Sequence, residues 1–234
     1  MLVRVLSGMS SIDASCPEYI SGHSTIDTSC PGYASGPAKI RFYHKFKRLI
    51  DIVVVLGSAP AVLLVLLVAS AAIYLLEGRP IFFTQNRVGK GGSVFRMLKL
   101  RTMVPGSCSQ QIATIENDPR ITPLGRFLRQ SHIDELPQLW NILVGHMTLI
   151  GPRPEQPALV DRYREKLPNY DLRHAVPPGL SGWAQVNFGY AADLTETAHK
   201  LDYDLEYVQR YGPLMDLIII VRTFRIFLDP RYVR

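Results

Sequence analysis

Cysteine is scarce in this sequence, which has three (Cys16, Cys30 and Cys108) among 234 residues. Their spacing matches no metal-ligand motif, and an odd count argues against a framework of disulfide bonds. The sequence therefore falls outside the disulfide-rich and zinc-ribbon classes, and a reducing cytosolic setting fits it best.

Large apolar side chains are sparse in residues 1–38, which are rich in Ser, Gly, Pro and Thr. Such a segment cannot bury enough apolar surface to offset the entropy lost on ordering, so we expect a disordered tail. No continuous apolar core follows the first residues either. We therefore expect no secretory signal peptide.

Charge is absent from residues 52–76, a run long enough to cross a bilayer as a helix. Pro60 removes a helical hydrogen bond and predicts a break, where Ser58 can bond a freed backbone group. Both flanks of the run are rich in Lys and Arg, and positive residues prefer the cytoplasmic side. This favours a helix-break-helix that re-enters on the same face. A simple span and a buried soluble helix stay open as alternatives.

The chain carries a formal charge of +6, which indicates an anionic partner such as nucleic acid, lipid head groups or a phosphorylated substrate. The cations cluster beside the hydrophobic run rather than among exposed aromatic side chains, so we expect no nucleic acid. The length suits one sizeable core. We expect a basic juxtamembrane segment and membrane helix over residues 39–78, then a catalytic domain over residues 79–234.

Two predicted strands come after the hydrophobic run and are separated by the glycine-rich residues 89–92. A β-hairpin is the economical interpretation. Alternation would place Lys99 and Arg101 on the same face of the second strand, where the two cations could meet a ligand. A solvated edge strand is the alternative.

Adjacent carboxylates stand beside two arginines in residues 125–141. Because Pro137 is tolerated only in the first turn of a helix, a helix should begin near Asp134, which would be its N-cap. Arg126 and Arg129 are three residues apart and could clamp phosphate oxygens, and Glu135 could hold a divalent cation. The plainer alternative is a capping pair without catalytic function.

Later segments add weaker signals. The proline-bracketed Arg153 should have a fixed direction. A loop over residues 176–187 contains Trp183 and Gln185, which suit a planar base, although Trp183 could equally pack in the core. Amphipathic helices are predicted near residues 198–208 and 214–228. The second could lie on a membrane surface, but core packing is the safer expectation.

Taken together, these motifs resemble the small monotopic phosphoglycosyl transferases, bacterial sugar transferases that act on polyprenyl phosphate. The resemblance covers nearly everything from residue 45 onward. The segments that carry it are Lys47-Arg48-x-x-Asp51, the proline-broken apolar run, Arg87-Val88-Gly89, Lys99-Leu100-Arg101-Thr102-Met103, Asn117-Asp118-Pro119-Arg120, Gly125-Arg126-x-x-Arg129, Asp134-Glu135-Leu136-Pro137-Gln138-Leu139, Gly151-Pro152-Arg153-Pro154 and Pro178-Gly179-Leu180-Ser181-Gly182-Trp183-Ala184-Gln185. The helix with Tyr203-Asp204-x-x-Tyr207 looks like the exopolysaccharide branch.

The resemblance implies residue roles. Asp134 would be the nucleophile, and Glu135 would be the ligand of Mg2+. The substrate-binding residues would be Lys99, Arg101, Arg126, Arg129, Arg153 and Gln185, and Ser58 and Pro60 would form the break in the membrane segment. The implied fold is mixed α/β and mostly helical. It has a small β-hairpin, a re-entrant hydrophobic segment and interfacial amphipathic helices.

The resemblance also implies an activity: transfer of a phosphosugar from a UDP-sugar to polyprenyl (undecaprenyl) phosphate, with release of UMP through a covalent aspartyl-phosphosugar. This would begin exopolysaccharide or glycoconjugate synthesis at the cytosolic face of the inner membrane, in contact with membrane lipid. The alternative is an inactive membrane scaffold of a polysaccharide assembly system. The sequence leaves homo-oligomer formation and the identity of the sugar open.

Overall fold

The computed structural model describes residues 37–107, 118–188 and 193–228. All three cysteines lie outside these ranges, and so does the expected disordered tail except for residues 37 and 38. The described elements are α1 (Pro37–Glu77), β1 (Phe82–Val88), η2 (Lys90–Gly92), β2 (Val94–Leu100), α2 (Pro123–Gln130), η4 (Ile133–Glu135), α3 (Gln138–Val144), β3 (Thr148–Ile150), α4 (Pro157–Lys166), η5 (Tyr170–Ala175), β4 (Gly179–Ser181), α5 (Trp183–Asn187), α6 (Leu194–Gln209) and α7 (Pro213–Leu228). The predicted fold class, mostly helical with a long apolar N-terminal helix and a small hairpin, is confirmed.

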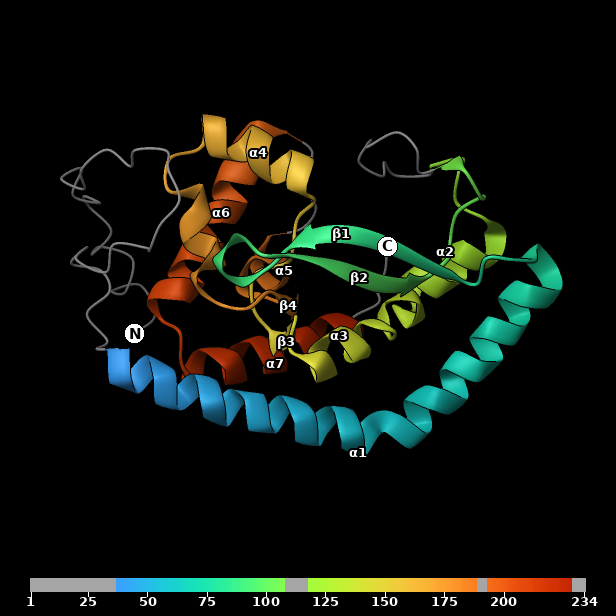
Figure 1. Cartoon of the computed structure of the whole chain (residues 1–234), viewed down its shortest axis with the longest axis horizontal. Helices are drawn as coiled ribbons and strands as arrows, with labels where there is room; N and C mark the ends of the chain where they lie inside the picture. Colours follow the sequence, from blue (N-terminus) through green and yellow to red (C-terminus); the bar gives the residue numbers. More distant parts are fainter. Residues whose placement is uncertain (1–36, 108–117, 189–192, 229–234) are drawn as a thin grey trace.

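Helix α1 is the apolar segment, and it bends near its middle while passing beneath the rest of the molecule (Figure 1). Pro60 lies inside it and supplies the cause, since its ring cannot donate a backbone hydrogen bond. The Ser58 hydroxyl donates to the carbonyls of Val54 (2.8 Å) and Val55 (3.2 Å) in the preceding turn. The carbonyl that Pro60 leaves without its helical partner is that of Leu56, so the expected bond from Ser58 to the freed group is not the one that forms. The expected break is therefore a bend within one continuous helix that contains Ser58 and Pro60.

The first half of α1 is fixed to the domain by polar contacts. Lys47 donates to the Tyr207 hydroxyl (3.2 Å) and pairs closely with Asp216 of α7. Arg48 donates to the carbonyl of Leu143 at the end of α3 (2.6 Å). Asp51 accepts from the Thr148 hydroxyl (2.6 Å). Charged side chains that would be costly in lipid are thus satisfied within the protein.

The second half of α1 rests on the same domain through apolar contacts. Ala69 and Ile73 are buried against Leu100 of β2 and Leu128 of α2. At the end of the helix the Arg101 guanidinium donates to the carbonyls of Glu77 (3.0 Å) and Gly78 (3.1 Å). One domain therefore holds both halves of the bent helix on its concave side.

The predicted hairpin is present: β1 and β2 are antiparallel, with Phe83 opposite Lys99 and Val88 opposite Val94. Beneath it, α3 contacts both α1 and β2. The Asn141 side chain fixes α3 to the strand, because it accepts from the Leu98 amide (3.0 Å) and donates to the Arg96 carbonyl (2.8 Å). These bonds set the distance between β2 and the turn that precedes α3.

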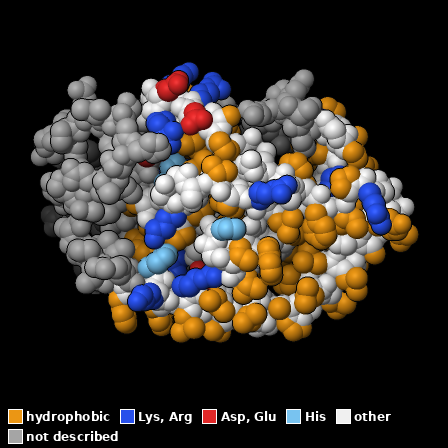
Figure 2. Space-filling model, in the orientation of Figure 1, with side chains coloured by type: hydrophobic (Ala, Val, Ile, Leu, Met, Phe, Trp, Pro, Cys, Tyr) orange, Lys and Arg blue, Asp and Glu red, His pale blue; other side chains and the backbone are white. Residues whose placement is uncertain are grey.

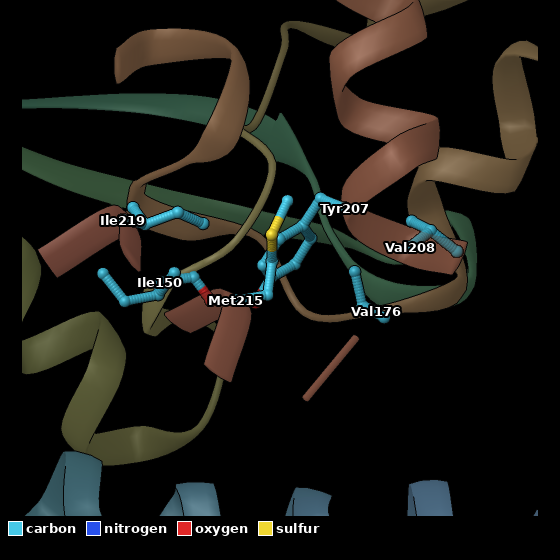
Figure 3. Close-up of a cluster of buried hydrophobic side chains, with 6 residues drawn as sticks. All are labelled: Ile150, Val176, Tyr207, Val208, Met215 and Ile219. Atoms are coloured by element: carbon cyan, nitrogen blue, oxygen red, sulfur yellow. Dashed lines mark hydrogen bonds between the residues drawn. The ribbon is translucent and has the colours of Figure 1, made fainter. Parts of the chain in front are cut away.

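A second small sheet was not predicted. Strands β3 and β4 are parallel, with Thr148 opposite Gly179 and Ile150 opposite Ser181. Figure 3 shows the core beside it, where Ile150, Val176, Tyr207, Val208, Met215 and Ile219 converge from β3, α6, α7 and the loop before β4. The Tyr207 hydroxyl lies 3.0 Å from the Ile150 carbonyl and 2.7 Å from Asp216. This core joins α6 and α7 to the central part of the fold.

Exposed apolar side chains cover the outer face of α1 and extend along the lower edge of the molecule (Figure 2). The segment Phe42–Glu77 of α1 is long and apolar enough to cross a membrane by length and composition. Helix α7 has two apolar faces: Met215 and Ile219 are buried, whereas Leu217, Val221 and Phe224 are exposed. The expectation of core packing is therefore confirmed for one face of α7. The other face exposes apolar side chains that could contact lipid.

Candidate active site

The two adjacent carboxylates lie in the short turn η4, not at the start of an α-helix. His132, with φ of 55°, precedes the turn, and no side chain caps it. The prediction that Asp134 is an N-cap is therefore wrong. Pro137 has no amide to bond the Ile133 carbonyl in α-helical fashion, so the Leu136 amide bonds it instead (3.2 Å) and α3 begins only at Gln138.

The buried side of α3 includes polar side chains. The most buried positions of α3 are Gln138, Asn141 and Ile142, whereas the Trp140 side chain is 60% exposed. The Asn141 amide faces β2, where it bonds the backbone of Arg96 and Leu98. Trp140 instead joins the exposed apolar side chains of the surface.

Asp134 is buried, with 6% of the residue exposed. No hydrogen bond joins its carboxylate to another side chain or amide among the residues that the structure describes. Burial raises the pKa of Asp134; Lys99 opposes this rise, and the neighbouring Glu135 charge adds to it. A buried carboxylate that makes no hydrogen bonds of its own keeps its oxygen lone pairs for a substrate.

Glu135, in contrast, is held by two cations from distant parts of the chain. Its Oε1 lies 2.7 Å from Lys99 Nζ of β2 and 2.5 Å from Arg153 Nη2. Within the described ranges, its Oε2 has only a longer contact to Arg153 Nη1, at 3.4 Å. Burial alone would raise the pKa of Glu135, but the charges of Arg153 and Lys99 outweigh it and hold that pKa well below its usual range.

A third cation, Arg129, is placed by α2. Gly125 lets this helix lie directly on residue 102, because a Cβ at that position would be 2.1 Å from the Thr102 carbonyl oxygen. The Arg129 Nε atom then donates to the Thr102 hydroxyl (2.8 Å). The Arg129 carbonyl accepts from the amide of His132 (3.1 Å), two residues before Asp134, and the charge of Arg129 lowers the pKa of Asp134.

Four of the predicted site residues therefore come together: Asp134, Glu135, Lys99 and Arg153, with Arg129 beside them. Arg101 does not join them. Strand β2 ends at Leu100, so the alternation of side chains between the two faces of the strand, which predicted that Lys99 and Arg101 share a face, does not extend to Arg101. Its guanidinium bonds the end of α1 instead, with a 3.5 Å ion pair to Glu77.

Arg126 and Gln185 are also placed apart from the carboxylates. Arg126 is exposed on α2, and no contact joins it to Asp134 or Glu135 in the described part of the chain. Gln185 donates to the Leu180 carbonyl (3.2 Å), and its other amide atom is buried without a partner among the described residues. Ser58 and Pro60 remain in α1, as expected.

Trp183 is a packing residue. Its indole N–H donates to Glu206 (2.7 Å), and the Arg222 guanidinium covers its ring at 4.5 Å from the centroid. Of the two interpretations of this loop, core packing is the one that the structure bears out, because one ring face and the polar edge are already engaged.

Sequence reasoning missed Thr102 and Asn141, which position Arg129 and α3 without entering the carboxylate cluster. Both sit beside the motifs that were recognised. Their partners lie 27 and 43 residues away in the chain, and no local pattern reports such a contact.

The two carboxylates offer few protein ligands for a magnesium ion. Among the described residues no group of three or more His, Cys, Asp and Glu side chains could hold a metal ion. Mg2+ commonly needs only one or two protein carboxylates when substrate phosphates and water complete its shell. The Asp134 oxygens and Glu135 Oε2 meet that need, so the residues fit a magnesium ion that arrives with a diphosphate.

Comparison with protein families matches residues 42–230 to the bacterial sugar transferase model. A protein of Aeromonas hydrophila named UDP-N-acetylgalactosamine-undecaprenyl-phosphate N-acetylgalactosaminephosphotransferase is 42% identical over 188 residues, which is 80% of this chain and 44% of that protein. A UDP-glucose:undecaprenyl-phosphate glucose-1-phosphate transferase of Caulobacter vibrioides is 39% identical over 76% of this chain and 67% of its own length.

A third relative is the exopolysaccharide production protein PSS of Rhizobium leguminosarum bv. phaseoli. It is 36% identical over 76% of this chain and 92% of its own length. The chain thus spans less than half of the Aeromonas protein but nearly the whole of the Rhizobium protein. The shared region includes every residue of the carboxylate cluster.

Proposed function

The chain belongs to the bacterial sugar transferase family, and we propose that it transfers a phosphosugar from a UDP-sugar to polyprenyl (undecaprenyl) phosphate and releases UMP. The named substrates of its relatives support this assignment. The observation that carries it is the arrangement of Asp134 and Glu135. One carboxylate is buried and, within the described ranges, free of hydrogen bonds, and its neighbour is fixed between two cations.

In the first step, a carboxylate oxygen of Asp134 attacks the β-phosphorus of the UDP-sugar. A bond forms between that oxygen and phosphorus while the bond from phosphorus to the bridging oxygen of the α-phosphate breaks. UMP leaves with the electron pair, and a phosphosugar is left on Asp134. Because Asp134 acts as an anion, no proton has to be removed from it.

In the second step, a phosphate oxygen of the lipid attacks the same phosphorus. The bond from phosphorus to Asp134 breaks, the carboxylate returns, and the product is a polyprenyl-diphosphate sugar. The two steps need positioned cations more than acid–base groups, because negative charge accumulates on phosphoryl oxygens. Lys99, Arg129 and Arg153 supply three such cations around Asp134.

Glu135 has two roles in this proposal. It holds Lys99 and Arg153 in place, and with Asp134 it would bind Mg2+ together with the diphosphate. Such an ion supplies charge neutralisation on the phosphates. The presence of the whole cluster favours an enzyme over the inactive scaffold that the sequence left open, since a scaffold has no use for a buried carboxylate poised beside three cations.

The lipid substrate requires a membrane, and we propose that α1 enters the cytosolic face of the inner membrane and returns to the same face. The bend at Pro60 supports this, and so do the polar contacts that tie both halves of α1 to one domain. The turn with the carboxylates lies next to the second half of α1, because Ile133 packs against the buried cluster that contains Ala69 and Ile73. A lipid phosphate at the membrane surface could thus approach Asp134.

The topology gives a testable prediction. In a chain whose native cysteines are replaced by serine, single cysteines at Lys45 and Thr84, both exposed positions on either side of the apolar run, should be labelled from the same side of sealed vesicles. A cysteine at Leu64, which is exposed on the apolar face of α1, should be protected by lipid. Labelling of Lys45→Cys and Thr84→Cys from opposite sides would establish a simple span instead.

The activity is tested by measuring UMP release from a panel of UDP-sugars, with polyprenyl phosphate and Mg2+ present. We expect release with at least one UDP-sugar, its loss when the metal is chelated, and its recovery when Mg2+ is restored. Absence of UMP with every UDP-sugar would contradict the assignment. The panel also identifies the sugar, which no residue of the cluster reveals.

A further inference from the structure

We propose that Arg173 and Asp204 are positioning residues that set the direction of Arg153, and through it of Glu135. This inference rests on the proposed function, because its readout is UMP release. Neither side chain contacts Asp134 or Glu135 in the described part of the chain. Their effect would pass through the backbone of the segment that carries Arg153.

Arg173, in η5, and Asp204, in α6, form a buried ion pair. Asp204 Oδ2 accepts from Arg173 Nε (3.0 Å) and from Nη2 (2.7 Å), and both side chains are nearly inaccessible to solvent. The third guanidinium nitrogen, Nη1, lies 3.3 Å from the Tyr170 hydroxyl. Every nitrogen of the guanidinium is thus engaged, which leaves this side chain a single orientation.

The same Nη2 atom of Arg173 donates a second hydrogen bond, to the backbone carbonyl of Arg153 (2.8 Å). That carbonyl is attached to the Cα atom from which the Arg153 side chain extends to Glu135. A shift of the carbonyl would therefore move the base of the side chain that holds Glu135. Asp204 of α6 is thus linked to Glu135 of η4 through Arg173 and Arg153.

Neighbouring bonds hold the same segment, and α6 supplies one of them as well. Arg87 donates to the Pro154 carbonyl (2.9 Å), and the Val88 amide donates to the Glu155 carbonyl (2.9 Å). Lys200, one helical turn before Asp204 on α6, pairs with the Glu155 side chain (2.6 Å). These contacts hold Pro154 and Glu155. Of the bonds found in the described part of the chain, the one from Arg173 acts on the Arg153 backbone itself.

A buried ion pair is a poor source of stability, because desolvation of both charges offsets much of their attraction. Burying Arg173 and Asp204 is better explained by the geometry that they impose. A displacement of about 1 Å in a positioning group can lower a rate by about a hundredfold. Lysine at position 173 keeps the positive charge but lacks the planar fork that reaches Asp204 and the Arg153 carbonyl together.

The test is a double-mutant cycle on UMP release by the full chain, with Arg173→Lys, Arg153→Lys and the double variant. We expect Arg173→Lys to lower kcat by about tenfold or more in the wild-type background, with a smaller change in KM. In the Arg153→Lys background the further loss should be less than about twofold. Arg164→Lys is the matched control, since Arg164 also binds an aspartate, Asp171 (2.7 Å), but on the exposed surface.

Equal losses in both backgrounds, or no loss from Arg173→Lys, would overturn the inference. If Arg173→Lys does not fold, as judged by thermal unfolding, Asp204→Asn takes its place in the same cycle, because it keeps the side-chain shape. Failure of both variants to fold would make the pair a stability element and would also overturn the inference. A wild-type chain that releases no UMP would instead contradict the proposed function.

Discussion

Asparagine in place of Asp134 should abolish UMP release, with a loss of at least about 1,000-fold, as is typical when a covalent nucleophile is removed. The amide has the same shape as the carboxylate but cannot form the bond to phosphorus. Because the Asp134 side chain makes no hydrogen bond within the described part of the chain, the substitution should leave the thermal unfolding temperature nearly unchanged.

The matched control for this substitution is Asp161→Asn. Asp161 is an exposed aspartate of α4 that pairs with the exposed Arg164, so its replacement should leave UMP release intact. A rate for Asp134→Asn within a few fold of the wild type would remove Asp134 from the role of nucleophile. The assignment of the rest of the cluster would then have to be rebuilt around another group.

Glutamine in place of Glu135 should lower kcat by about a hundredfold, because a neutral side chain can no longer fix the two cations that stabilise charge on the phosphates. Lys99 and Arg153 would both lose their buried partner. Glu165→Gln, on the exposed surface of α4, is the matched control and should retain activity. A fully active Glu135→Gln variant would contradict both the positioning role and the magnesium role proposed for this residue.

The same variant should change the pH profile. Asp134 must be ionised to attack, and burial raises its pKa. As the pH is lowered, kcat/KM of the wild type should therefore begin to fall at a higher pH than it would with an ordinary aspartate as nucleophile. The Glu135 charge adds to that rise, whereas Lys99 opposes it. Removing the Glu135 charge should therefore move the acid limb to lower pH. A limb that moves to higher pH would contradict the electrostatic roles assigned to these residues.

The sequence was sufficient for features that depend on local patterns. The charge-free run with Pro60 predicted the bent helix, and alternating residues around a glycine-rich turn predicted the hairpin. Asp134 and Glu135 stood out because they are adjacent and come shortly after two arginines. In each case the physical cause is contained within a few residues of the chain.

Features that depend on distant contacts were missed or misplaced. Strands β3 and β4 have three residues each and pair across a long separation, so neither shows a usable period. The N-cap prediction failed because a proline can come after a short turn as well as begin a helix. The contact of Arg101 with the end of α1 was not foreseen, because a strand pattern does not reveal a partner so far away in the chain.

A single-turnover experiment determines whether Asp134 carries the phosphosugar between the two substrates. The wild-type chain is mixed with a UDP-sugar labelled at the β-phosphorus, without polyprenyl phosphate. We predict about one UMP per chain and the label on the peptide that contains Asp134, with transfer of the label to lipid once polyprenyl phosphate is added. UMP release that begins only after the lipid is added, with no labelled peptide, would contradict the covalent route.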